Sequence, residues 1–225
     1  MTDVVHTRPA LRGRSTRLAA AVFLLLTAVH LVAQLAGSGP LADRTQWFLM
    51  PALAAVLWCA TAAPRPRLVR LVLVALAFSW VGDTLPDLFD GDAAFLAMVG
   101  GFLVAQVVYA VAFWPHRRDS VLRRPAVLAV YVLAAVVLVG LCLPGAGVLG
   151  VAVVVYALCL GTMAVLSTGV HRLAAIGGAV FLASDAMIAL GAFTDWFAPP
   201  LDGFWVMLTY LAGQTLLVAG VLARR

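Results

Sequence analysis

The sequence predicts an all-α, polytopic integral membrane protein with about eight transmembrane helices, arranged as two parallel four-helix repeats. Three observations lead to this prediction. Of the 225 residues, 64% are hydrophobic and only 11% are charged, whereas soluble domains carry about 45–50% apolar and roughly 25% charged residues. The apolar residues form long runs, and the turns between the runs carry arginine and aspartate in alternation. A chain of this composition requires lipid as its solvent.

Each apolar run can cross the hydrocarbon core of a bilayer, which takes about 20 residues of helix. The expected spans are 18–36, 47–63, 68–86, 95–114, 125–143, 147–166, 172–192 and 204–222. Residues 1–17 precede them as a basic tail, so that 18–225 form a single membrane domain. The first run exceeds the roughly 7–15 apolar residues of a signal peptide, and we expect it to stay in the protein. Turn residues such as Pro199-Pro200 separate the runs.

The charges in the turns predict the orientation of the chain. Every strongly basic segment falls on one side of an eight-span arrangement: the N-terminal tail, the turns containing Arg65, Arg117 and Arg172, and the final Arg224-Arg225. The intervening turns carry most of the aspartates. The positive-inside rule therefore places both termini in the cytoplasm, in a multi-pass protein of the cell membrane. It also accounts for the net charge of +5 without nucleic-acid binding, because the arginines form no single basic face.

The two halves of the chain, about 18–114 and 125–222, resemble each other. The third expected span contains "FSWVGDTL" with Asp83, and the seventh contains "FLASDAMIAL" with Asp185. Each aspartate lies 13 residues after a basic residue at the start of its span, which corresponds to about 20 Å along a helix. Two units of four spans each have the same orientation, so we expect a pseudo-two-fold axis along the membrane normal.

Polar side chains at membrane depth are the candidates for a functional site, because an ionisable group there costs roughly 2.5 kcal/mol or more. Asp83 and Asp185 are the main candidates, and the alternative is that they join helices through hydrogen bonds. Gln106 and Gln214 occupy matching places in the spans that follow. The expected substrate-binding set is completed by Tyr109, Tyr156 and His30, and it does not include Tyr210. Buried tyrosine and amide groups also often serve only to connect helices.

Several common chemistries are missing from the sequence. It contains no G-x-S-x-G elbow, no H-E-x-x-H motif and no Walker loop. The four histidines and three cysteines are scattered, which disfavours a metal site, and no cofactor is expected. Carboxyl groups, amides, hydroxyls and water remain, and together they are suited to acid–base catalysis.

These motifs are similar to those of the YhhN-like membrane proteins, a family that includes the animal lysoplasmalogenases. The resemblance covers about residues 45–220 and is carried by "FSWVGDTL" with "GGFLVAQVVYAVAF", then by "GGAVFLASDAMIALGAF" with "LTYLAGQTLLVAG". The chain departs from the family at two places. It has Gln106 where the family often has histidine, and Met50-Pro51 where the family often has Lys-Pro.

The resemblance implies a hydrolase of lipid metabolism that cleaves the vinyl-ether bond of lysoplasmalogens, a class of ether lipids. Its partners would be membrane lipids and a lysophospholipid substrate. Vinyl ethers hydrolyse through protonation of the β-carbon, and water traps the resulting oxocarbenium ion. We expect Asp83 and Asp185 to supply a neutral acid and a cation-stabilising carboxylate, in either assignment. Gln106 and Gln214 would orient water or substrate oxygens. The alternatives are a small-molecule or lipid transporter and a non-catalytic membrane scaffold.

Overall fold

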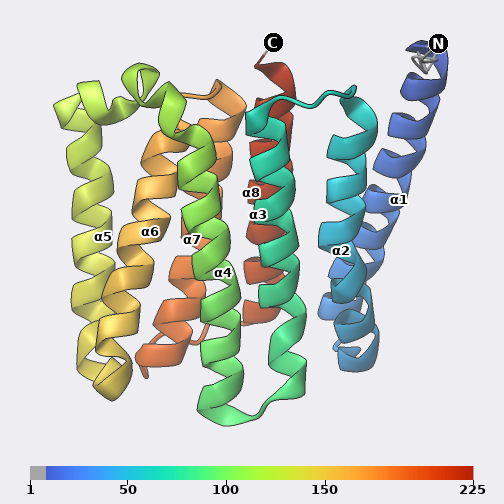
Figure 1. The fold of residues 1–225 in the computed structure, drawn as a ribbon. Helices are drawn as coiled ribbons and strands as arrows, with labels where there is room; N and C mark the ends of the chain where they lie inside the picture. The colour runs from blue at the N-terminus through green and yellow to red at the C-terminus, as the bar shows by residue number, and fades with distance from the viewer. Residues whose placement is uncertain (1–8, 225) are drawn as a thin grey trace.

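A computed structural model describes residues 9–224 of the chain, and these residues form helices joined by turns, without strands. The α-helices are α1 (Pro9–Leu35), α2 (Gly39–Ala60), α3 (Arg67–Thr84), α4 (Gly91–Phe113), α5 (Pro125–Ala146), α6 (Gly150–Ser167), α7 (Arg172–Phe193) and α8 (Asp202–Ala223). Short 3-10 helices lie between them: η1 (Leu85–Leu88), η2 (Trp114–Asp119), η3 (Val121–Arg123) and η4 (Gly147–Leu149). The start of α1 and the end of α8 lie at the same end of the bundle (Figure 1). The all-α prediction is confirmed.

Six segments of the described chain are long and apolar enough to cross a membrane. They are Gly13–Leu35, Arg67–Leu88, Gly91–Asp119, Pro125–Ser167, Arg172–Phe193 and Asp202–Ala223. The fourth segment is 43 residues long and contains both α5 and α6. Helix α2 is not among the six, and its first two turns carry the polar residues Asp43, Arg44 and Gln46. The chain is therefore a multi-pass membrane protein.

The helix bounds differ from the expected spans mainly at the first two helices. Helix α1 begins at Pro9, so the second half of the expected tail 1–17 is helical, while residues 1–8 lie outside the described part of the chain. Helix α2 begins at Gly39, with Pro40 in its first turn. Proline is favoured at the first position of a helix because the backbone N–H that it lacks would have no partner there. The described part of α1 therefore includes residues that hydropathy alone assigns to the tail, and α2 starts in a segment that it assigns to a turn.

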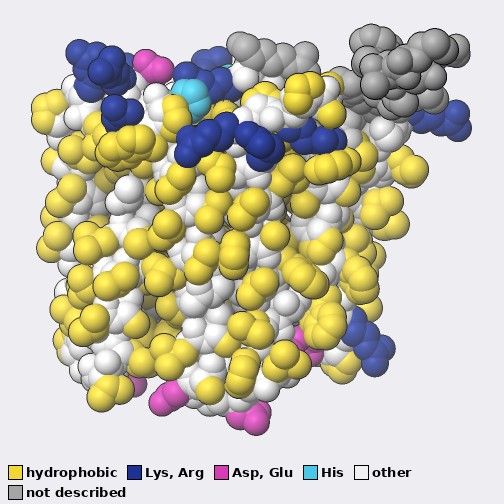
Figure 2. Space-filling model, viewed as in Figure 1, with side chains coloured by type: hydrophobic (Ala, Val, Ile, Leu, Met, Phe, Trp, Pro, Cys, Tyr) yellow, Lys and Arg dark blue, Asp and Glu magenta, His cyan; other side chains and the backbone are white. Residues whose placement is uncertain are grey.

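The outer surface of the bundle is apolar along its middle and charged at its ends. Figure 2 shows hydrophobic side chains over the central band, most of the visible arginines at one end and most of the visible aspartates at the other. Helices α1 and α5 lie at opposite edges of the bundle in Figure 1. Only Cys142 and Ala146 of α5 are buried, so most of this helix faces outward. This surface matches the apolar core and the charged boundaries of a bilayer.

Glycines allow two helix pairs to approach closely, one in each half of the chain. A Cβ atom on Gly101 of α4 would lie 2.5 Å from the backbone nitrogen of Gly82 in α3. A Cβ atom on Gly177 of α7 would lie 2.7 Å from the backbone nitrogen of Leu217 in α8. Small residues at such crossings are typical of helix packing in membranes. Asp83 follows Gly82 directly, so the contact of α3 with α4 fixes the backbone that carries this aspartate.

Candidate functional site

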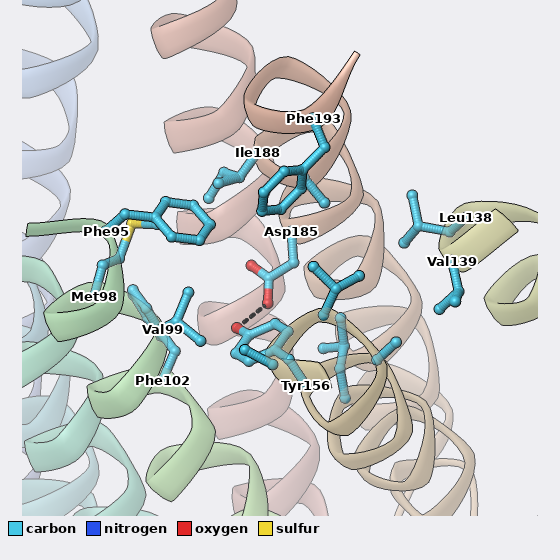
Figure 3. Close-up of a pocket in the computed structure, with 15 residues that line it drawn as sticks. Phe95, Met98, Val99, Phe102, Leu138, Val139, Tyr156, Asp185, Ile188 and Phe193 are labelled. Carbon is cyan, nitrogen blue, oxygen red and sulfur yellow. Dashed lines mark hydrogen bonds between the residues drawn. The ribbon is translucent and has the colours of Figure 1, made fainter. Parts of the chain in front are cut away.

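A pocket opens between α4, α5, α6 and α7, and Asp185 lies in its wall (Figure 3). The empty space between these helices is about 660 Å³, a figure that includes the open space at the mouth. Apolar side chains such as Phe95 and Phe102 of α4 and Ile188 of α7 form most of the wall. Asp185 and Tyr156 supply its polar atoms.

Asp185 and Tyr156 are joined by a short hydrogen bond. The Tyr156 hydroxyl on α6 donates to Oδ2 of Asp185 on α7 at 2.5 Å. The carboxyl group is almost completely buried, with Asp185 only 7% exposed. In Figure 3 the second carboxyl oxygen points away from Tyr156, into the pocket on the side of Phe95. Tyrosine therefore holds one oxygen of the acid, and the other oxygen faces the space that a ligand would fill.

Asp83 does not line this pocket, although it makes a similar contact next to it. The Tyr210 hydroxyl on α8 donates to Oδ2 of Asp83 at 2.8 Å. The ring of Tyr210 packs edge to face on that of Phe102, with 5.6 Å between the centroids, and Phe102 lines the pocket. The carboxyl groups of Asp83 and Asp185 are close enough to interact electrostatically. Asp83 is thus connected to the pocket wall through Tyr210 and Phe102, and only Asp185 is itself in that wall.

Gln214 is held on both sides by the protein. The Tyr109 hydroxyl donates to its Oε1 at 2.6 Å, and its Nε2 donates to the Ser79 hydroxyl at 3.0 Å. All three side chains are fully buried. These bonds connect α4, α8 and α3 one helical turn from Asp83, because Ser79 lies four residues before it. Gln214 and Tyr109 therefore stabilise the contact between these helices.

Gln106 is in a different situation from Gln214, although the two residues occupy matching places in the sequence. It is fully buried, and neither its Oε1 nor its Nε2 has a hydrogen-bond partner in the described part of the chain. The side chain lies beside Tyr156 without a well-aligned hydrogen bond to its hydroxyl. A buried polar group without a partner costs about 1–3 kcal/mol, and such groups in native proteins usually bind water or a ligand. Gln106 is therefore available to bind a polar atom next to Tyr156.

His30 is placed away from these residues, in the contact of α1 with α2. Its Nδ1 lies 2.9 Å from the Thr45 hydroxyl oxygen and 3.1 Å from the Ala42 carbonyl oxygen. It is not among the residues that line the pocket. Of the predicted site residues, the structure brings together the two aspartates, the two glutamines, Tyr109 and Tyr156, while His30 lies elsewhere.

Two residues of this polar cluster are absent from the predicted set, namely Tyr210 and Ser79. Tyr210 precedes Gln214 by four residues, and Ser79 precedes Asp83 by four. Residues four apart share one face of a helix. That spacing is the signal that could have found them. Within residues 9–224, no group of three or more histidine, cysteine or acidic residues is placed to hold a metal ion.

The fold and the site define a multi-pass membrane protein with buried acid–tyrosine pairs beside an apolar pocket. The model of the YhhN family matches residues 41–221, so the chain belongs to the YhhN family, as its motifs indicate. Comparisons with curated proteins and with solved structures find no match.

Proposed function

We propose that this protein is a membrane hydrolase that cleaves the vinyl-ether bond of lysoplasmalogen-type lysophospholipids by acid–base catalysis. The observation that carries the proposal is the carboxyl group of Asp185, held by Tyr156 in the wall of an otherwise apolar pocket. A membrane scaffold would need only the hydrogen bonds between helices and no cavity beside the acid. The pocket next to Asp185 favours a ligand-binding role over that alternative.

Asp185 is the proton donor in this proposal because it is the carboxyl group that faces the pocket. In its neutral form it transfers a proton to the β-carbon of the vinyl ether, and the electrons of the double bond form the new C–H bond. The α-carbon and its oxygen become an oxocarbenium ion. Water adds to the α-carbon and returns a proton to the Asp185 carboxylate. The hemiacetal then collapses to a fatty aldehyde and a glycerophospho-alcohol. Tyr156 keeps the carboxyl group in place through Oδ2.

Asp83 and Gln106 have supporting roles in the same reaction. Asp83 does not line the pocket but interacts electrostatically with Asp185, so its carboxylate stabilises the positive charge of the intermediate through space. Gln106 has a buried amide without a partner beside Tyr156, and this amide holds the attacking water. Gln214 and Tyr109 act as positioning residues, because the protein itself uses their polar atoms.

The test is aldehyde release by the purified protein in detergent. Lysoplasmenyl-choline and lysoplasmenyl-ethanolamine are the substrates, with saturated alkyl-ether and acyl lysolipids as controls. We expect aldehyde from the vinyl ethers only, and its loss in both Asp83→Asn and Asp185→Asn. Full turnover of a vinyl ether by both variants would refute the assignment of the acids. A folded protein that releases no aldehyde would refute the hydrolase and favour transport.

We also propose that the chain crosses the membrane eight times, in two parallel repeats, with both termini in the cytoplasm. Supporting it, α5 and α6 share one apolar segment of 43 residues, and the arginines gather at one end of the bundle. Exposed residues at the two ends provide a test, namely Asp92 at the start of α4 and Arg118 after its end. An impermeant maleimide should label Asp92→Cys in intact cells, but Arg118→Cys only after permeabilisation. The reverse pattern would invert the topology.

A further inference from the structure

The mouth of the pocket lies in the apolar part of the helices that form it. All of its lining residues belong to segments that are long and apolar enough to cross a membrane. Neighbouring side chains on three of these helices are large, apolar and exposed, with Leu96 at 45%, Val137 at 50% and Val155 at 43% exposure. Lining residues such as Leu138 are themselves partly exposed. The pocket is therefore open to its surroundings at a level where those surroundings are hydrocarbon.

The end of the pocket nearer the aspartate-rich turns is bridged by two aromatic rings. Phe95, in the second turn of α4, and Phe193, the last residue of α7, pack edge to face with 5.5 Å between their centroids. Both rings line the pocket. They lie between Asp185 and the turns that follow, so a ligand arriving from water at this end would meet aromatic rings before any polar group.

Depth also favours a ligand that arrives from the membrane. Asp185 lies eight residues before Phe193, which is about 12 Å along the helix, while half of the hydrocarbon core is about 15 Å thick. Apart from Tyr156, the wall over this distance has no polar side chain. A polar solute has no hydrogen-bonding partner along such a route, whereas a hydrocarbon chain needs none.

We infer that this pocket is the binding site for the hydrocarbon chain of a single-chain lipid, which enters sideways from the bilayer past α4. This inference rests on the proposed function for the identity of the reacting bond and adds to it the seat and the entry route of the chain. The chain lies against the apolar wall, and the ether linkage that it carries lies beside Asp185. Activity then depends on how the chain fits the wall as well as on the headgroup.

The probe for this inference is a saturated alkyl-ether lysophospholipid with a diazirine in its chain, which contains no vinyl ether. After irradiation in lipid nanodiscs, the labelled peptides are mapped by mass spectrometry. We expect labelling of α4 and α7 around the pocket, and its loss on competition with unlabelled alkyl-ether lysolipid. Ala189→Phe fills the pocket from α7 and should abolish this labelling, whereas Ala183→Phe, on the exposed side of the same helix, should leave it unchanged.

A second pair of variants provides the same test if Ala189→Phe does not fold. Ala152→Phe fills the pocket from α6, and Val151→Phe adds similar bulk to a neighbouring residue that is 77% exposed. Labelling that persists in folded Ala189→Phe or Ala152→Phe, or that spreads evenly over outward-facing residues of α1 and α5, would overturn the inference. Because the probe is not a substrate, a labelled pocket without aldehyde release would refute only the proposed reaction. Aldehyde release with label elsewhere would refute only the chain site.

Discussion

The two buried glutamines should respond differently to the same substitution. Methionine has nearly the length and volume of glutamine but no amide, so Gln106→Met and Gln214→Met each remove polar atoms while keeping the packing. Gln214→Met breaks two hydrogen bonds, from Tyr109 at 2.6 Å and to Ser79 at 3.0 Å. Gln106→Met breaks none in the described part of the chain, because both of its amide atoms lack partners there. The two variants are therefore matched controls for each other.

The size of the effect follows from the bonds that are lost. Hydrogen bonds between helices in membranes contribute about 0.6 kcal/mol on average and about 1.7 kcal/mol at most. The loss of two should lower the free energy of unfolding by about 1–3 kcal/mol. At about 2–4 °C per kcal/mol for a chain of this size, Gln214→Met should lower Tm by several degrees. Gln106→Met should leave Tm unchanged or raise it, since it removes a buried polar group that has no protein partner.

The assay is thermal unfolding of the detergent-purified variants, followed by aldehyde release at a temperature where both are folded. Gln106→Met should have lost most of its turnover while keeping its stability. If Gln106→Met lowered Tm as much as Gln214→Met, the amide of Gln106 would have partners within the protein, and the role proposed for it in holding water would be wrong.

Three further predictions concern packing, the end of the chain and the acid. Gly101→Ala should lower the free energy of unfolding by about 1–3 kcal/mol, because its Cβ would lie 2.5 Å from the backbone of α3. Gly100 faces open space, so Gly100→Ala should have no effect in the same thermal-unfolding measurement. Arg224→Gln should lower Tm, since the guanidinium donates to two carbonyl oxygens in the turn between α6 and α7; an unchanged Tm would show that this contact does not hold α8. Tyr156→Phe should reduce aldehyde release about 10- to 100-fold, because it removes a hydrogen bond of about 1.5–3 kcal/mol to Asp185. The control is Tyr131→Phe, on α5 outside the pocket wall.

The helices and the gathering of most arginines at one end of the bundle were accessible from the sequence because they depend on local features. Hydrophobic runs identify segments that can span a membrane, and the arginines mark one end of the bundle. The two aspartates were also accessible, because a carboxyl group inside an apolar run is costly whatever surrounds it. These signals need no knowledge of which helices are neighbours.

The partners of the polar residues depend on tertiary structure and were not accessible in this way. Asp83 pairs with Tyr210, which lies 127 residues away in the chain. Gln106 and Gln214 look equivalent in the sequence, yet only Gln214 makes hydrogen bonds with hydroxyl groups. The difference arises because the rotation and the neighbours of each helix decide which groups meet. The same reason explains why His30 pairs with Thr45 of α2 and does not line the pocket.

The most direct test of the proposed reaction is turnover of lysoplasmenyl-choline in water enriched in oxygen-18, with mass spectrometry of the glycerophosphocholine product. Protonation of the β-carbon by Asp185 leads to a hemiacetal, and its collapse breaks the bond between the ether oxygen and the former alkenyl carbon. The glycerol hydroxyl of the product should therefore contain no heavy oxygen, and the fatty aldehyde should appear in equal amount. Heavy oxygen in that hydroxyl would mean that water attacked the glycerol carbon, and the mechanism proposed for the pocket would be wrong.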